Sequence, residues 1–416
     1  MNSKVKSLLF SVIAVLLGLA LIPLTLEIAL RFFPVFSGMP VNRESAIYSF
    51  IPNTTIQRSN HWDMTGARKR QVNNVGFISD QAYIPAAQSN DGNQSLKPLI
   101  AIIGDSYIEA MQVDYANTTE ANLLKNCSEH ARVYSFGAQF APLSQYLSWV
   151  DYASKTFAPK AMVINIVGND FDESLLSYQR SSNGGGVPGM QFFELTQDAS
   201  DLVIVPFKSE GVITRLLRHS VLAQYLVRNV GVVNLWKDYR QQLLAPSQGK
   251  SISKEMKSGN KSDTSLAGVV SPIAQDPHSE YVGNARRIYD AQKLQDSQKA
   301  VDEFLQRLPQ LAQLPPKSIV LSVDAERPQI YTPKGRQDID SFFSVMRAYF
   351  IQQARAQGFE VLDLRPAMIA QFDRTGERFE FADDNHWNAA GHQLLASQLL
   401  RIPAISAICQ GAASSR

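Results

Sequence analysis

Residues 98–106 read PLIAIIGDS, and this stretch decides the fold. Residues 98–103 form a short apolar run that ends in Gly104, which is typical of a strand buried on both faces of a parallel sheet. The same pattern returns in residues 131–135, 160–167, 318–323 and 359–364, and helical patterns such as residues 338–357 and 388–401 separate the runs. Strands that alternate with helices predict an α/β fold with a doubly wound parallel sheet. In such sheets the chemistry lies at the carboxyl ends of the strands.

The predicted strands and helices fall into two stretches of the chain. They predict a discontinuous catalytic domain over residues 98–175 and 316–408. Residues 176–315 break the rhythm and predict a large, mainly helical insertion. It holds expected helices over residues 213–239 and 284–308, and a flexible loop at about 245–280. Residues 33–97 are polar and turn-rich, with a hairpin expected over residues 71–78. We expect this juxtamembrane segment to pack on the catalytic domain.

The first residues of the chain indicate export. Lys4 and Lys6 precede residues 7–26, which carry no charge and are long enough for a helix that crosses a membrane. Residues 1–32 are therefore expected to form an N-terminal transmembrane anchor, although a cleaved signal peptide stays open as the alternative. The two lysines favour a cytoplasmic N-terminus. We expect a single-pass protein of the inner (cytoplasmic) membrane, with a periplasmic or otherwise extracytoplasmic catalytic domain.

Charge and cysteine content exclude several classes of function. The formal net charge is +2 and no basic block stands out, which argues against a nucleic-acid partner. Two cysteines are too few for a metal cluster or a disulfide scaffold. Four of the six histidines are scattered without the spacing of metal ligands: His61, His130, His219 and His278. We therefore expect neither a metal nor an organic cofactor.

Polar residues follow two of the predicted strands directly. Ser106 stands where the first strand must turn into a helix, which would expose its hydroxyl at the edge of the sheet. The alternative role for Ser106 is that of a helix N-cap. Asn169, in the sequence Gly168-Asn169-Asp170, follows the third strand and is placed to stabilise the oxyanion of a tetrahedral intermediate. Its alternative role is an Asx turn.

A histidine near the C-terminus completes the pattern. Residues 383–387 read Asp-Asp-Asn-His-Trp, ahead of an expected helix. An aspartate in the same tight loop can orient His386, which then serves as the general base to a serine. The D-x-x-H spacing favours Asp383 over Asp384 for this task. Together with Ser106, these residues predict a Ser-His-Asp triad.

The three motifs, taken in this order at strand ends, resemble those of the SGNH (GDSL-like) hydrolases. The resemblance covers about residues 98–175 and 316–405. The expected membrane anchor also resembles the architecture of family members from the bacterial cell envelope. It implies a three-layer flavodoxin-like fold and a shallow, open active site. One motif departs from the family pattern, because Phe140 aligns with the glycine whose backbone N–H completes the oxyanion hole. Either Phe140 or Gly137 is therefore the second backbone donor, next to the N–H of Ser106.

The resemblance implies a serine esterase or O-acyltransferase that works through an acyl-enzyme. Export and anchoring favour O-acetyl esters of an envelope polysaccharide as substrates, with a membrane-embedded protein as a candidate acyl donor. A lipid or lysophospholipid esterase is the alternative enzyme. A carbohydrate-binding or assembly factor that retains the fold without catalysis is the alternative from another class. The order of residues does not separate transfer to water from transfer to a sugar hydroxyl.

The two cysteines are predicted to form a disulfide. Cys127 ends the first long helix after Ser106, and Cys409 follows the last helix. In a flavodoxin-like winding these helices lie on the same face of the sheet and finish at the same end, within the Cα separation that a bridge requires. The alternative is two unrelated small apolar residues.

Overall fold

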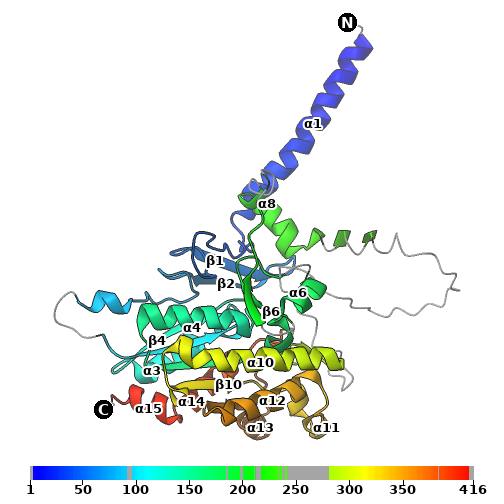
Figure 1. Cartoon of the computed structure of the whole chain (residues 1–416). Coiled ribbons are helices and arrows are strands. Elements are labelled where there is room, and N and C mark those ends of the chain that lie inside the picture. The colour runs from blue at the N-terminus through cyan, green and yellow to red at the C-terminus, as the bar shows by residue number, and fades with distance from the viewer. Residues whose placement is uncertain are drawn as a thin grey trace, which may run out of the picture. The chain divides into compact units, whose positions relative to one another are not determined.

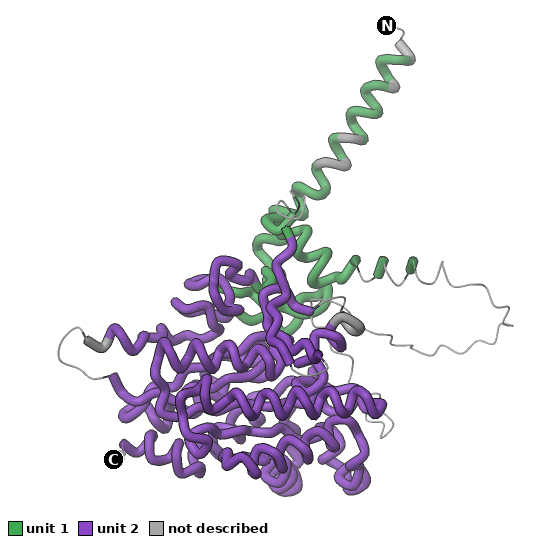
Figure 2. The backbone as a smooth tube through the Cα atoms, in the orientation of Figure 1, with its two compact units in different colours: residues 1–39, 55–69, 209–269 green, residues 40–54, 70–208, 270–416 purple. Residues whose placement is uncertain are grey.

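The computed structural model describes residues 3–90, 96–183, 186–196, 200–209, 211, 217–233, 235–236, 239–240, 281–382 and 384–411. The chain divides into two compact units (Figure 2). Unit 1 consists of residues 1–39, 55–69 and 209–269, and unit 2 consists of residues 40–54, 70–208 and 270–416. All candidate site residues that the structure describes belong to unit 2.

Unit 2 is built on a parallel sheet of five strands in the order β11-β10-β5-β3-β4. Figure 1 labels β4 and β10 of this sheet. The strands are β3 (Leu99–Gly104), β4 (Arg132–Gly137), β5 (Ala161–Ile166), β10 (Ile319–Val323) and β11 (Glu360–Asp363). They coincide closely with the five apolar runs, so the predicted parallel sheet is confirmed. Along the chain, the first strand lies between the second and the third, which is the flavodoxin-like order. The winding reverses between β3 and β5, where sheets of this kind bind ligands.

The sheet forms the core because its central strands are almost wholly apolar. Every residue of β3 and of β5 is buried. Ile103 pairs in register with Phe136 of β4 and with Ile164 of β5. A sheet without a polar face must be covered on both sides, and this requirement explains the two helical layers.

Helices cover both faces of the sheet. One layer consists of α4 (Leu143–Phe157), α10 (Ala291–Ala312) and α12 (Phe342–Ala356). The other consists of α3 (Thr119–Cys127), α13 (Leu364–Thr375), α14 (Ala389–Leu399) and α15 (Pro403–Cys409), whose apolar residues form one buried cluster with the strands. The three-layer arrangement is the one that the sequence predicted.

The part of the insertion that belongs to unit 2 contains two antiparallel hairpins that the sequence analysis did not predict. After α6 (Leu176–Asn183) come β6 (Gln191–Leu195) with β7 (Ser200–Ile204), and β8 (Tyr281–Val282) with β9 (Ala285–Arg286). The helix expected from residue 284 begins only at Ala291, because the carboxylate of Asp290 caps it by accepting the N–H of Lys293 at 2.7 Å. The flexible loop expected at 245–280 lies outside the described residues.

Short elements complete unit 2. They are α2 (Ser106–Glu109), α5 (Asp170–Glu173), α11 (Pro333–Arg336), η1 (Ala86–Asn90), η2 (Tyr115–Asn117), η4 (Pro316–Ser318) and η5 (Gln329–Tyr331). An antiparallel bridge joins Val72 to Ile78, at the place of the expected hairpin over residues 71–78. Both α2 and α5 begin directly after a central strand, so the sheet itself positions their first residues.

Unit 1 contains α1 (Ser3–Leu30), β1 (Thr55–Asn60), most of β2 (Thr65–Gln71), α8 (Val221–Gln224) and the π-helical turn η3 (Tyr225–Asn229). The Glu27 carboxylate of α1 accepts hydrogen bonds from the Ser220 hydroxyl at 2.8 Å and from the Leu222 N–H at 2.9 Å. Of the helix predicted over residues 213–239, the structure describes only part, including α8 and η3.

The structure corrects the prediction of a transmembrane anchor. That prediction rested on the length, the apolar composition and the lack of charge of residues 7–26. In the described part of the chain, no helix combines the length and the apolar character that crossing a membrane requires. The single-pass inner-membrane location rested on that anchor and is corrected with it.

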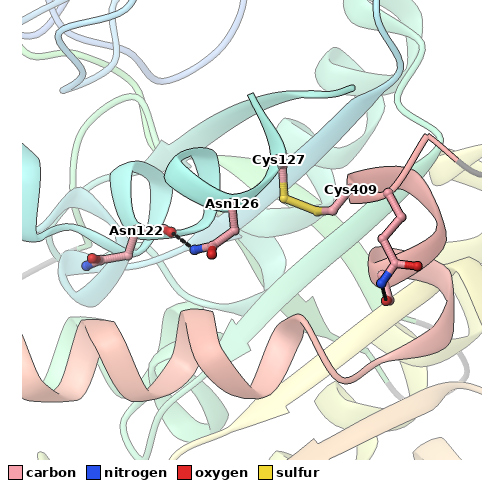
Figure 3. The surroundings of a disulfide bond; sticks show 6 residues. Asn122, Asn126, Cys127 and Cys409 are labelled. Carbon is pink, nitrogen blue, oxygen red and sulfur yellow. Dashed lines mark hydrogen bonds between the residues drawn. A yellow bond between two sulfur atoms is a disulfide. The ribbon is translucent and has the colours of Figure 1, made fainter. Parts of the chain in front are cut away.

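A disulfide joins Cys127 to Cys409, as predicted (Figure 3). Cys127 is the last residue of α3 and Cys409 is the last residue of α15, and their Cα atoms lie 4.2 Å apart. Both side chains are buried in the cluster between the sheet and its helices. The predicted helix α14 packs along α3, and the short helix α15 that follows it also contacts α3 and carries Cys409.

Candidate active site

Ser106 lies at the carboxyl end of the central strand β3, as the first residue of α2. Asp105, and not Ser106, is the N-cap of this helix, because its carboxylate accepts the N–H of Tyr107 at 2.9 Å. The capping role is therefore filled, and the Ser106 hydroxyl is available for another partner. Ser106 is only 8% exposed, so few water molecules compete for that hydroxyl.

That partner is His386, whose Nε2 lies 2.8 Å from the Ser106 Oγ. The two residues are 280 positions apart in the chain. The histidine loop is held by an antiparallel bridge between Glu380 and Trp387, and the Trp387 indole N–H donates to Asp324 at 3.2 Å. The predicted pairing of serine and histidine is thus present in the structure.

The carboxylate that orients His386 belongs to Asp384. Its Oδ1 contacts the ring Nδ1 of His386 and also accepts the backbone N–H of His386 at 2.9 Å. A proton on Nδ1 that is shared with Asp384 leaves Nε2 free to accept the Ser106 hydroxyl. Sequence spacing had ranked Asp383 first and Asp384 second, and Asp383 lies outside the described residues. Among the described residues, Ser106, His386 and Asp384 are connected in the order of a Ser-His-Asp triad.

A second carboxyl group lies beside the nucleophile. The Asp105 Oδ2 is 3.2 Å from the Ser106 Oγ, a longer contact than the one to His386. Burial raises the pKa of Asp105 to about 6, although the N–H of Tyr107 and the charge of His386 act in the opposite direction. By distance, the closer partner of the Ser106 hydroxyl is His386 Nε2.

Tyr107 and Arg327 tie the serine turn to the histidine loop. The Tyr107 hydroxyl donates to the Asn385 carbonyl at 2.8 Å and accepts from the Arg327 guanidinium at 3.1 Å. Arg327 also donates to the same carbonyl at 3.1 Å. Because Tyr107 follows Ser106 and Asn385 precedes His386, these contacts hold the reacting pair in register.

Arg327 is buried and keeps its charge through its partners. It forms ion pairs with Asp324 at 2.7 Å and with Glu380 at 3.3 Å. Burial opposes the charge, but these carboxylates raise the pKa of Arg327 well above its ordinary value. The sequence analysis missed this group, although Asp324, Glu326 and Arg327 directly follow the apolar run of β10. Charged residues at a fourth strand end were the signal that could have revealed it.

Asn169 follows β5 and lies just before α5. Its side chain accepts no hydrogen bond from the backbone N–H groups that open this helix, so it does not form the Asx turn that was the alternative role. Its Nδ2 donates to Glu173 Oε2 at 2.8 Å, and its Oδ1 accepts from the Nδ2 of Asn284. An amide nitrogen carries two protons, so one remains for a further acceptor.

The two candidates for the second backbone donor differ in position. Gly137 is the last residue of β4, paired in register with Gly104, and a Cβ there would lie 2.5 Å from the backbone N of Glu109. A glycine is needed at 137 because α2 packs directly against the strand. Phe140 lies in the turn beyond, with φ +64°, a left-handed conformation that ordinarily favours glycine. Phe140 thus has the backbone conformation expected of the residue that the family fills with glycine.

Among the described residues, no three histidine, cysteine, aspartate or glutamate side chains lie close enough together to hold a metal ion. His392, six residues after His386, is buried and contacts the Thr119 hydroxyl at 3.0 Å through Nδ1. Its ring packs edge-on against Trp387, with ring centroids 5.7 Å apart. We therefore assign His392 to the packing of α14 on α3.

No protein-family model and no curated protein matches this chain. Among solved structures, it is similar to a member of the lipolytic G-D-S-L family from Veillonella parvula, at 12% identity and a TM-score of 0.33, over 73% of this chain and 97% of that one. It is also similar to a lipase/acylhydrolase from Enterococcus faecalis, at 13% identity and a TM-score of 0.32, over 73% of this chain and 94% of that one. An acetyl xylan esterase aligns at 10% identity with a TM-score of 0.35, over 73% of this chain and 98% of that one.

Proposed function

We propose that this protein is an acyl-ester hydrolase with Ser106 as nucleophile, His386 as general base and Asp384 as the orienting acid. One observation carries the proposal: the Ser106 Oγ lies 2.8 Å from His386 Nε2, while the opposite ring nitrogen contacts the buried Asp384 carboxylate. This arrangement polarises a hydroxyl that is otherwise a poor nucleophile. A protein that only binds carbohydrate has no need of it.

Each half-reaction moves one proton through His386. In the first, the Ser106 Oγ attacks the ester carbonyl while Nε2 takes its proton, and the tetrahedral intermediate collapses as His386 returns that proton to the departing alcohol. In the second, water attacks the acyl-enzyme, Nε2 takes the proton of the water, and Ser106 recovers it when the acid leaves. Asp384 stabilises the imidazolium in both halves. The Ser106 N–H, the Asn169 amide and the Phe140 N–H are assigned to the oxyanion.

The proposed substrate is an O-acetyl ester carried by a polysaccharide. Its support is the accessibility of the reacting edge, because the His386 side chain is 21% exposed although Ser106 is nearly buried. A polymer cannot enter a deep cavity, so a site near the surface suits an ester that projects from a sugar chain.

The test is ester turnover by the purified full chain. p-Nitrophenyl acetate, butyrate and octanoate would be compared, and acetate release from an acetylated xylan would be measured beside them. We expect the highest kcat/KM with the acetyl ester and acetate release from the polymer, both lost in Ser106→Ala. A preference for octanoate would overturn the assignment of the acyl group. Equal turnover by the parent and Ser106→Ala would overturn the assignment of a hydrolase with Ser106 as nucleophile. Turnover by neither protein would overturn the hydrolase assignment and favour the carbohydrate-binding alternative.

A further inference from the structure

The hairpin formed by β8 and β9 contacts three of the loops at the carboxyl ends of the strands. The N–H of Gly283 at its tip donates to the Arg327 carbonyl at 2.7 Å, and the Gly283 carbonyl accepts from the Asn385 side chain at 3.3 Å. The next residue, Asn284, contacts Asn169 through two hydrogen bonds. The hairpin therefore reaches the loops that carry Arg327, His386 and Asn169.

The two contacts between Asn284 and Asn169 determine which way both side-chain amides face. The backbone N–H of Asn169 can only donate, so the atom of Asn284 that lies 3.2 Å away must be the oxygen Oδ1. The other end of the Asn284 amide is then its NH₂ group, which can only donate. Its contact on Asn169 must consequently be the oxygen of that side chain. This reasoning orients the Asn169 amide from donor and acceptor chemistry alone.

Glu173 holds the opposite end of the Asn169 amide. The Asn169 Nδ2 donates to the Glu173 Oε2 at 2.8 Å, which uses one of its two protons. Burial, followed by the nearby Asp172 charge, raises the pKa of Glu173 to about 8, so near neutral pH its carboxyl group adds little negative charge beside the amide. The second Nδ2 proton is left for the oxyanion.

Gly168 allows Asn284 to come this close. A Cβ at position 168 would lie 2.9 Å from the Asn284 Oδ1 and 3.0 Å from the ring of Phe343. Any larger residue would push the hairpin away from Asn169. The small residue before Asn169 therefore makes room for the contact from the insertion.

We propose that Asn284 is a positioning residue for catalysis, an inference that rests on the proposed hydrolase function. It fixes the orientation of the Asn169 amide so that an N–H, and not the carbonyl oxygen, faces the oxyanion. Without Asn284, the Asn169 side chain can rotate by half a turn about its last bond and present its oxygen instead. That orientation would oppose the developing negative charge. Asn284 does not touch the reacting atoms and acts through Asn169.

The variants that test this are Asn284→Ala, Asn284→Asp and Asn169→Ala, with the double variant Asn169→Ala/Asn284→Ala. Asn169→Ala should lower kcat roughly 10²–10³-fold, as expected for one lost oxyanion donor. Asn284→Ala should lower kcat about 10- to 100-fold with KM changed less than about twofold. Asn284→Asp keeps the shape of the hairpin but cannot donate to Asn169, so we expect a loss at least as large.

The deciding readout is additivity. If Asn284 acts only through Asn169, the double variant should be as active as Asn169→Ala, within about twofold. A purely structural role would lower activity in both backgrounds, so losses that multiply would overturn the proposal. Full activity in Asn284→Asp would overturn it as well. Asn126→Ala, the same change at an exposed asparagine of α3 (Figure 3), is the matched control and should be as active as the parent.

Ser106→Ala separates this proposal from the proposed function. If the parent is active and Ser106→Ala is not, but the Asn284 variants match the parent, the hydrolase assignment stands and only the role of Asn284 fails. If Ser106→Ala retains the parent's activity, the hydrolase assignment itself fails.

Discussion

In unit 2 the segment from Ser106 to Cys127 is joined to the segment from His386 to Cys409 at two places, once through a hydrogen bond and once through a covalent bond. At the carboxyl ends of the strands, Ser106 meets His386 across 280 residues. At the far ends of the helices, Cys127 is bonded to Cys409 across 282 residues. Between them α3 packs along α14, where the Thr119 hydroxyl contacts the His392 ring.

The difference follows from what each end must do. In the proposed mechanism the Ser106–His386 contact has to break and re-form as protons move, so only a hydrogen bond can serve there. The cysteine end carries out no chemistry that the structure reveals, and a permanent bond there costs no function. Changes at the first end should therefore affect the rate and leave stability nearly unchanged, whereas changes at the second end should do the reverse.

The largest expected effect is the loss of the reacting pair. Ser106→Ala and His386→Ala should each lower kcat for an acyl ester on the order of 10⁴-fold or more, and the double variant should be no slower than either. Steady-state kinetics measure this, and thermal unfolding should show that both variants keep the parent's fold. Residual activity of Ser106→Ala within tenfold of the parent would contradict the serine mechanism.

The next effect separates two neighbouring carboxylates. Asp384→Asn should lower kcat on the order of 10³-fold, because an amide no longer favours the required tautomer of His386. Asp383→Asn is the matched control, the same change one residue away, and we expect it to be at least tenfold less harmful. If Asp383→Asn proved the more damaging variant, the D-x-x-H assignment would be right and the contact with Asp384 would be secondary.

Loss of the Cys127–Cys409 disulfide should change the stability of the protein and not its rate. Replacing both cysteines by alanine should lower the free energy of unfolding by about 2–5 kcal/mol and change kcat less than about twofold. Urea unfolding and steady-state kinetics on the same preparation measure both quantities. Thiol counting on the denatured, unreduced parent is the direct check, and two free thiols per chain would show that the bridge is absent.

The smallest expected effect is on the pH dependence of stability. It concerns His392, which contacts Thr119 where α14 packs along α3. Burial, with smaller contributions from Arg70 and His386, lowers the pKa of His392 to about 3, below its ordinary value of 6.5. The unfolded chain therefore binds a proton that the folded chain refuses, and this residue removes stability as the pH falls from 6.5 towards 3. Between pH 7 and pH 5 its share should be about 2 kcal/mol.

Comparing urea unfolding of the parent and His392→Gln at both pH values isolates that share. The difference in stability between the two proteins should shift in favour of the variant at pH 5. An unchanged difference would show that His392 is protonated in the folded state, or that its ring is not buried.

The sequence predicted the sheet well because each central strand is a short apolar run bounded by polar residues. The positions of Ser106, Asn169 and His386 in the fold could be predicted for a related reason, since each stands at a fixed place after a strand or before a helix. The disulfide followed from the direction in which two helices leave the same edge of the sheet. In each case a local pattern and the parallel topology together determine the position.

What the sequence could not supply depends on loop geometry and on long-range contacts. Asp383 and Asp384 are chemically identical, and the contact of Asp384 with His386 depends on the conformation of a loop that sequence spacing does not define. Asn284 lies in a two-residue turn between strands of two residues each, too short for any periodicity to reveal. The span of residues 7–26 was misjudged because composition was taken as sufficient.

The bridge between the cysteines also determines what a break in the backbone would do. Ser106 precedes Cys127, whereas His386 lies between the two cysteines. A protease that cuts once anywhere between Cys127 and Asp384 separates the nucleophile from its base along the chain, but the two fragments stay joined through sulfur. A nicked molecule would run as one species on an unreduced gel and as two after reduction. Its reacting pair would remain tethered until a reductant released it.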